Sequence, residues 1–203
     1  MPDARTHDLI TLATGAALAP LAYGYFDGPL QRPHGDAMTL TLWLVGAHIV
    51  SGVLFSPDLD LDSAIDNRWG IFYWIWRPYM WAVPHRHFWS HSFVFAPLMR
   101  LAYFYAVVSG LLFLWVFLLG RLGVVVPDYH LRLFGHLRAL LGANPDITFL
   151  VLVGFCAGSA AHTIADWLVT NGKRFLRMLG LRVARDYSHH DDDIHRRRRR
   201  RYA

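Results

Sequence analysis

The sequence contains no glutamate: all fifteen of its acidic residues are aspartate. It has a single cysteine, Cys156, which lies in an apolar run. No disulfide can therefore form within the chain, and packing is the expected role of this side chain. The glycine patterns of serine-hydrolase elbows, P-loops and dinucleotide-binding turns are also missing from the sequence. These absences argue against a disulfide-stabilised secreted domain and against those three classes of enzyme.

Hydrophobic residues make up 54% of the 203 residues, and the mean hydropathy is +0.25. Both values are high for a soluble domain and are typical of a membrane protein with several spans and short loops. The net charge of +5 is unevenly placed, since eleven Lys or Arg residues stand against four Asp from Lys173 onward. We therefore expect a membrane-embedded helical domain at residues 1–175 and a basic, disordered cytoplasmic tail at 176–203.

Four apolar runs are long enough to cross a bilayer as helices. They cover residues 9–25, 38–55, 93–120 and 147–169. The first run has a signal peptide as its alternative, but the polar Thr6-His7-Asp8 directly before it fits a site at the membrane surface better. The second contains His48, which is either a functional intramembrane residue or a neutral histidine hydrogen-bonded to a neighbouring helix. The expected fold is an all-α, polytopic membrane protein with about four transmembrane helices.

An aromatic segment at residues 69–83 separates the second and third runs. Its density of Trp and Tyr, with Arg68 and Arg77, predicts a segment that lies in the headgroup region. A short buried helix is the alternative. Residues 121–146 form a polar connection with room for a short helix, and the small residues at 154–161 favour a close approach of the fourth span to another helix.

Aspartate and histidine residues are concentrated near the ends of these runs. Carboxylates and imidazoles are the usual ligands of zinc and similar divalent metals, so we treat these residues as candidate ligands. The candidates are His7, Asp8, Asp58, Asp60, His85, His91, His162 and Asp166. The positive-inside rule predicts a cytoplasmic tail, and four spans then put both termini and all eight candidates at the cytoplasmic face.

The spacing within these groups leaves two choices open. His162 and Asp166 are four residues apart and would share one face of a helix. They form either part of a metal site or a plain His–Asp hydrogen bond between helices. His87 is also four residues from His91, so either His85 or His87 pairs with His91 at a metal.

The candidate set offers more donors than one tetrahedral zinc requires, and it would suit a two-metal site that hydrolyses a phosphoester. Asp58 or Asp60 would then act as general base, and Arg86, beside the histidines, would hold a phosphate. A headgroup or an aspartate is the alternative partner of Arg86. No spacing supports a Ser-His-Asp triad at Ser90 or Ser92.

Five short motifs, in this order over residues 1–175, resemble an uncharacterised bacterial family of metal-binding membrane proteins. They are Arg5-Thr6-His7-Asp8, Pro57-Asp58-Leu59-Asp60, Arg68-Trp69-Gly70, His85-Arg86 with Ser90-His91, and His162 with Asp166-Trp167. The chain is also similar to inner-membrane metal-dependent hydrolases, and more weakly to zinc-dependent phospholipase C and its nuclease relatives. The resemblance implies metal binding by the eight candidate ligands, and hydrolysis as the activity. His87, Asp62 and the arginine tail do not match it.

We therefore expect a membrane protein that binds a divalent metal, zinc in preference to manganese, and hydrolyses a lipid or a phosphoester at the cytoplasmic face of a bacterial inner membrane. The competing hypotheses are a non-catalytic metal-binding structural or accessory protein and a metal transporter. Six consecutive arginines, from Arg196 to Arg201, would bind anionic lipid headgroups or nucleic acid. Their alternative role is that of a solubilising, topology-setting tail.

Overall fold

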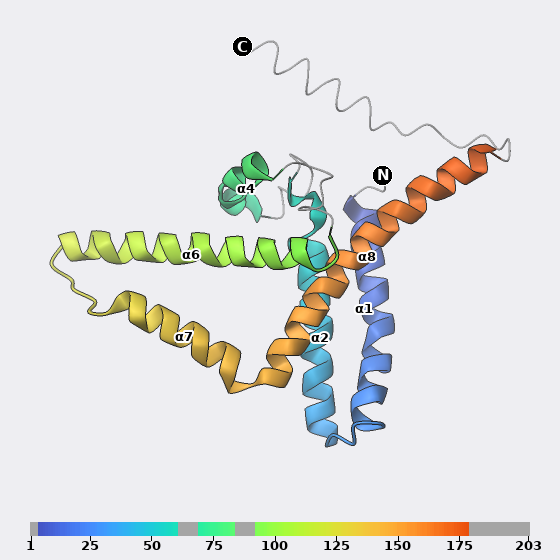
Figure 1. Ribbon diagram of the computed structural model, residues 1–203, viewed down its shortest axis with the longest axis horizontal. Coiled ribbons are helices and arrows are strands. Elements are labelled where there is room, and N and C mark those ends of the chain that lie inside the picture. Colours follow the sequence, from blue (N-terminus) through green and yellow to red (C-terminus); the bar gives the residue numbers. More distant parts are fainter. Residues whose placement is uncertain (1–3, 61–68, 84–91, 179–203) are drawn as a thin grey trace, which may run out of the picture.

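A computed structural model describes residues 4–60, 69–83 and 92–178 (Figure 1). Within these ranges the chain is helical and has no strand, which confirms the all-α prediction. The elements are α1 (Ala4–Asp27), α2 (His34–Leu54), the 3-10 helices η1 (Pro57–Asp60) and η2 (Gly70–Ile75), α4 (Arg77–Ala82), α6 (Phe95–Arg121), α7 (Tyr129–Ala143) and α8 (Pro145–Met178).

Four helices, α1, α2, α6 and α8, are long and apolar enough to cross a membrane, and they coincide with the four predicted runs. Their ends differ from the prediction. α1 begins at Ala4, so His7 and Asp8 lie inside its first two turns and not before the helix. α8 continues to Met178, well beyond the predicted end at residue 169. Hydropathy detects only the apolar part of a helix, whereas backbone hydrogen bonding continues through polar turns at either end.

α1, α2 and α8 form a three-helix bundle. α1 and α2 run antiparallel side by side, and α8 packs against both (Figure 1). Where α1 and α2 are joined, a buried cluster comprises Ala22, Phe26, Ala37, Leu40 and Leu44. Beside it, Arg32 donates a 2.8 Å hydrogen bond to the carboxylate of Asp146 at the start of α8. The hairpin of α1 and α2 is therefore the frame onto which α8 docks.

α2 and α8 approach each other closely at two glycines of α8. A Cβ atom at Gly154 would lie 2.2 Å from the carbonyl oxygen of Leu44, and one at Gly158 would lie 2.1 Å from that of His48. Any side chain at these positions would push the two backbones apart. The prediction that small residues at 154–161 permit a close helix approach is thus confirmed.

The aromatic segment is divided between the core and the surface. Trp76 and Tyr79 are buried, whereas Trp74 and Trp81 are 73% and 90% exposed. The buried pair packs with Phe55, Leu59 and Phe155. These rings meet largely edge to face, the arrangement that aromatic quadrupoles favour. One face of the segment therefore belongs to the core, as in the buried-helix alternative, and the other is exposed, as a surface segment requires.

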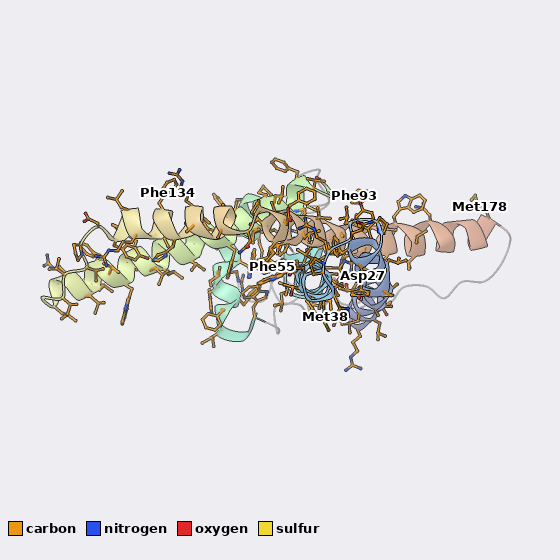
Figure 2. The ribbon with its side chains drawn as sticks, turned by 90° about the horizontal axis from the view of Figure 1, so that it is seen from below. Asp27, Met38, Phe55, Phe93, Phe134 and Met178 are labelled. Atoms are coloured by element: carbon orange, nitrogen blue, oxygen red, sulfur yellow. The ribbon has the colours of Figure 1, made fainter. Side chains whose placement is uncertain are left out.

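α6 and α7 form an arm that projects from the bundle. Figure 1 shows α6 roughly at right angles to α1 and α2; it begins near α2 and α8 and extends away from the bundle. Figure 2 agrees: α1 and α2 are seen nearly end-on, while α6 and α7 extend to one side and α8 extends to the other toward Met178. The buried residues of α6, which are Ala96, Pro97 and Arg100, all lie in its first two turns. α7 is the short helix expected within 121–146.

Candidate metal centre

His7 is buried although it lies near the start of α1. Its side chain is 3% exposed, and Thr11, one turn later on the same helix face, is fully buried. α2 lies against this face so closely that a Cβ atom at Gly52 would come within 2.5 Å of the Thr11 side chain. Close packing of α1 on the bundle therefore carries the His7 imidazole into the interior.

α8 supplies two further polar side chains at the same place. His162 is 1% exposed and Asp166 is 7% exposed. Because they are four residues apart, they lie one turn above the other on one face of the helix. Nε2 of His162 is 3.7 Å from Oδ2 of Asp166.

The imidazole rings of His7 and His162 are stacked, with centroids 3.7 Å apart and an interplanar angle of 16°. Nε2 of His7 lies 3.2 Å from Oδ1 of Asp166. One donor atom from each of the three residues lies within 4.8 Å of the other two. Ligand atoms at about 2.0–2.2 Å from a tetrahedral zinc stand roughly 3.3 Å apart, so the two nitrogen–oxygen separations fit a shared metal.

Several polar atoms of this cluster have unused hydrogen-bonding capacity. Both ring nitrogens of His7 and both carboxylate oxygens of Asp166 are buried, and apart from the close His–Asp approaches within the cluster they have no hydrogen-bond partner among the described residues. Leaving a buried polar group unsatisfied costs about 1–3 kcal/mol. A divalent cation between the three side chains would bind a ring nitrogen of His7 and a carboxylate oxygen of Asp166 at the same time. The residues present therefore fit a metal.

The comparison with protein families agrees with this geometry. The sequence model of a family described as uncharacterized metal-binding protein (DUF2227) matches residues 2–176. The chain belongs to this family. The predicted resemblance to an uncharacterised metal-binding family is thereby confirmed. Comparisons with curated proteins and with solved structures give no match, and the likeness to hydrolases stays a prediction.

Three further candidate ligands of this DUF2227 protein lie on described helices. Asp8 follows His7 on α1 and is half-buried, but it is not part of the group of three. Asp58 and Asp60 lie in η1, which directly follows the end of α2 and contacts α8. The backbone of η1 is described, whereas the side chains of these two aspartates are not. Their predicted roles as ligands and as general base stay predictions.

The remaining predicted site residues lie outside the described part of the chain. They are His85, Arg86 and His91, which fall in the segment 84–91. The arginines from Arg196 to Arg201 likewise fall outside it. Among the described residues, the group of three is the part of the predicted site that the structure brings together, and it combines the first and the last of the five sequence motifs.

His48 has a structural role in the DUF2227 bundle. Its Nε2 lies 2.9 Å from the Thr14 hydroxyl oxygen and 3.2 Å from the carbonyl oxygen of Thr11. A carbonyl oxygen only accepts hydrogen bonds, so the contact with Thr11 requires a proton on Nε2. The alternative of a histidine hydrogen-bonded to a neighbouring helix is confirmed.

Sequence reasoning gave no role to Arg100, which is 1% exposed. Its guanidinium donates hydrogen bonds to the carbonyl oxygen of Phe55 and to the hydroxyl of Ser159. Phe55 lies two residues before η1, and Ser159 lies one turn before His162. The signal was available, since a lone arginine inside an apolar run is costly unless its donors are satisfied.

Proposed function

We propose that this protein holds a divalent metal between α1 and α8 and uses it to hydrolyse a phosphoester or an ester of a membrane lipid. The observation that supports the proposal is the buried His7–His162–Asp166 cluster, with a nitrogen and carboxylate oxygens that have no other partner among the described residues. Zinc is the first choice because two imidazoles and a carboxylate are a common donor set for it, and manganese is the second.

Three protein ligands are the number that hydrolytic zinc sites use, because the fourth position takes water or substrate. A metal in such a site lowers the pKa of water and polarises a phosphoryl or carbonyl oxygen. Asp58 and Asp60 are proposed to move the proton, since η1 contacts the helix that carries His162 and Asp166. Arg86 is proposed to hold the anionic group of the substrate.

Five more residues enter the proposal from the sequence alone. Asp8, Asp58, Asp60, His85 and His91 would complete the first metal site or build a second one beside it. Two metals 3.5–4 Å apart, roughly, would clamp the attacking and leaving oxygens of a phosphoester. The number of metal ions per chain, once measured, would distinguish a one-metal site from a two-metal site.

The second candidate function is a structural metal site. One feature favours it: the ligands come from α1 and α8, so a metal would tie the first described helix to the last. A structural zinc has all four positions filled by protein ligands and does not exchange water. The transporter hypothesis gains no support, because His48, its one hint at mid-helix, is hydrogen-bonded to α1.

Metal content tests the proposal directly. The full-length protein, with His189, His190 and His195 changed to alanine to remove adventitious ligands, is purified in detergent without chelators and measured by elemental mass spectrometry. We expect one or two zinc or manganese ions per chain, and their loss in His7→Ala, His162→Ala and Asp166→Asn. His136→Ala and Asp36→Asn are matched controls on exposed helix surfaces and keep the metal.

The outcomes separate the two functions. A protein without stoichiometric metal overturns both. Stoichiometric metal together with hydrolysis of phospholipid vesicles that is lost in the same variants supports the hydrolase. Stoichiometric metal with no turnover of phospholipid, phosphomonoester or carboxylester substrates supports the structural role and contradicts the hydrolase.

Membrane insertion and orientation are part of the proposal. The four long apolar helices, the positive-inside rule and the basic tail support a multi-pass protein of the bacterial inner membrane with both termini in the cytoplasm. The arginines from Arg196 to Arg201 would add about 1 kcal/mol each to binding of anionic headgroups. If the arginines bind lipid, deleting them should reduce the fraction of protein that sediments with anionic vesicles. If deletion instead reduces binding to DNA and leaves vesicle binding unchanged, nucleic acid is the partner.

A further inference from the structure

A groove with a volume of about 610 Å³ runs along the bundle between α1 and α8. Its walls include Ile10 and Leu18 from α1 and Ala157, Ala161 and Leu168 from α8. The volume lies within the range of roughly 300–1,000 Å³ that is usual for sites of small ligands. Alanines at 157, 160, 161 and 165 leave this space because α8 presents a single methyl group at each of these wall positions.

The surface of the groove is almost entirely hydrocarbon. Thr14 and His48 are the polar residues among those that line it, and they lie 2.9 Å from each other. The Thr14 hydroxyl also donates a 2.8 Å hydrogen bond to the carbonyl oxygen of Ile10. The Thr14 hydroxyl and Nε2 of His48 are thus engaged within the wall, and Nδ1 of His48 is buried. An apolar chain suits such a groove, whereas a polar molecule would lose its hydration without new hydrogen bonds.

The groove adjoins the candidate metal centre. On α8, Ile164 and Ala165 line the groove and directly precede Asp166. On α1, Ile10 lies about one turn from His7. Because successive residues turn by about 100° around a helix, the groove face of α8 borders the face that carries the metal ligands. The groove therefore lies beside the buried cluster, with Ala165 of its wall next to Asp166 in the chain.

Basic residues lie in the sequence of both helices on the side of the candidate metal centre that is away from the groove. Arg5 precedes His7 in the first turn of α1 and is exposed. α8 continues past Asp166 with Lys173 and Arg174. An anionic headgroup at this end would be matched in charge by Arg5, while its hydrocarbon chain extended along the groove away from this end.

We propose that the groove binds one acyl chain of an anionic phospholipid and places the lipid phosphate at the His7–His162–Asp166 cluster. This assignment rests on the proposed lipid hydrolysis and names its substrate class. In this arrangement α1 and α8 would bind both the acyl chain and the metal.

The test uses phosphatidic acid that carries a photoreactive diazirine on its acyl chain. The full-length protein is mixed with it in detergent micelles and irradiated, and the labelled peptides are mapped. We expect labelling at residues 10–18 and 157–168. Ala157→Phe should lower this labelling about tenfold, because excluding even two methylene groups from an apolar site costs that much affinity. Ala102→Phe adds the same bulk on an exposed face of α6 and should leave it unchanged.

Metal content is measured on the same samples, so that the two proposals are judged separately. Labelling spread evenly over α6 and the groove, or unaffected by Ala157→Phe, overturns the groove assignment whatever the metal content. Groove labelling in a protein without stoichiometric metal supports the lipid site and overturns the hydrolase. If Ala157→Phe does not fold, Ala160→Phe takes its place and should lower the labelling in the same way. The labels on the unaltered protein must also be concentrated at residues 10–18 and 157–168.

Discussion

The guanidinium of Arg100 donates a 2.9 Å hydrogen bond to the hydroxyl of Ser159, deep between α6 and α8. The same side chain donates to the carbonyl oxygen of Phe55 at the end of α2 and, through Nε, to the carbonyl oxygen of Ala96. One arginine thus joins the root of the arm to two helices of the bundle. Its bonds lie about one turn from His162, so the arm and the candidate metal centre share a support.

Arg100→Met should destabilise the protein strongly. The substitution keeps much of the hydrocarbon volume but leaves the Phe55 carbonyl and the Ser159 hydroxyl without their charged donor. We expect the free energy of unfolding to fall by roughly 3 kcal/mol, since hydrogen bonds to charged groups contribute about 1.5–3 kcal/mol each. Denaturant unfolding in micelles, followed by circular dichroism, measures the change. Arg121→Met, at the exposed far end of α6, is the matched control and should change little.

Gly158→Ala should separate α2 from α8. The new Cβ atom would lie 2.1 Å from the His48 carbonyl oxygen, a backbone atom that cannot turn aside. We expect a loss of about 1–3 kcal/mol in the free energy of unfolding. In Gly110→Ala the Cβ atom meets nothing within 4 Å, so this variant should be neutral or up to about 1 kcal/mol more stable. Equal effects of the two substitutions would contradict the close approach.

Trp76→Ala and Trp81→Ala should differ strongly in stability, because one removes a side chain from the buried face of the aromatic segment and the other from its exposed face. Trp76 is fully buried, and its removal should leave a cavity and cost about 3–5 kcal/mol in the free energy of unfolding. Trp81 is 90% exposed, so the matched change should stay within about 0.5 kcal/mol. Thermal unfolding of both variants checks the difference. A destabilisation by Trp81→Ala as large as that by Trp76→Ala would show that the exposed face is covered.

Zinc should raise the melting temperature of the full-length protein, because a ligand that binds only the folded state stabilises it. At a free zinc concentration one hundred times the Kd, the gain is about 2.7 kcal/mol, and a chelator should reverse it. His162→Ala should abolish the shift and His136→Ala should retain it. A shift that calcium reproduces, or that survives in His162→Ala, would mean that zinc acts elsewhere on the chain.

Hydropathy predicted the four long helices well, because each is an apolar run of sufficient length. It could not predict the direction of α6, since a run that is apolar all round fits a helix that extends away from the bundle as well as one within it. Nor could it find the first turns of α1, where polar residues lie within a helix. The divided aromatic segment could not be predicted for a similar reason: burial of Trp76 depends on partners such as Phe104, which lies on another helix.

The part of the candidate site that could be predicted from the sequence is the pair of residues that lie close together in the chain. The four-residue separation of His162 and Asp166 predicts a shared helix face, and the structure shows one. The stacking of His7 on His162 was not accessible, because it depends on how α1 packs against α8. Arg100 was overlooked for the opposite reason, since its sequence signal was present but gave no indication of its partners.

The cluster takes its residues from α1 and α8, the first and last described helices, and this has a consequence for the order of assembly. During synthesis the hairpin of α1 and α2 can form early, because its contacts are local and its chain is made first. His7 is then already in place, but its partners on α8 emerge only after every other described helix has been made. A chain that stops short of α8 therefore carries a single histidine of the cluster. Metal binding by the cluster would therefore come late in folding, after α8 has packed against α1.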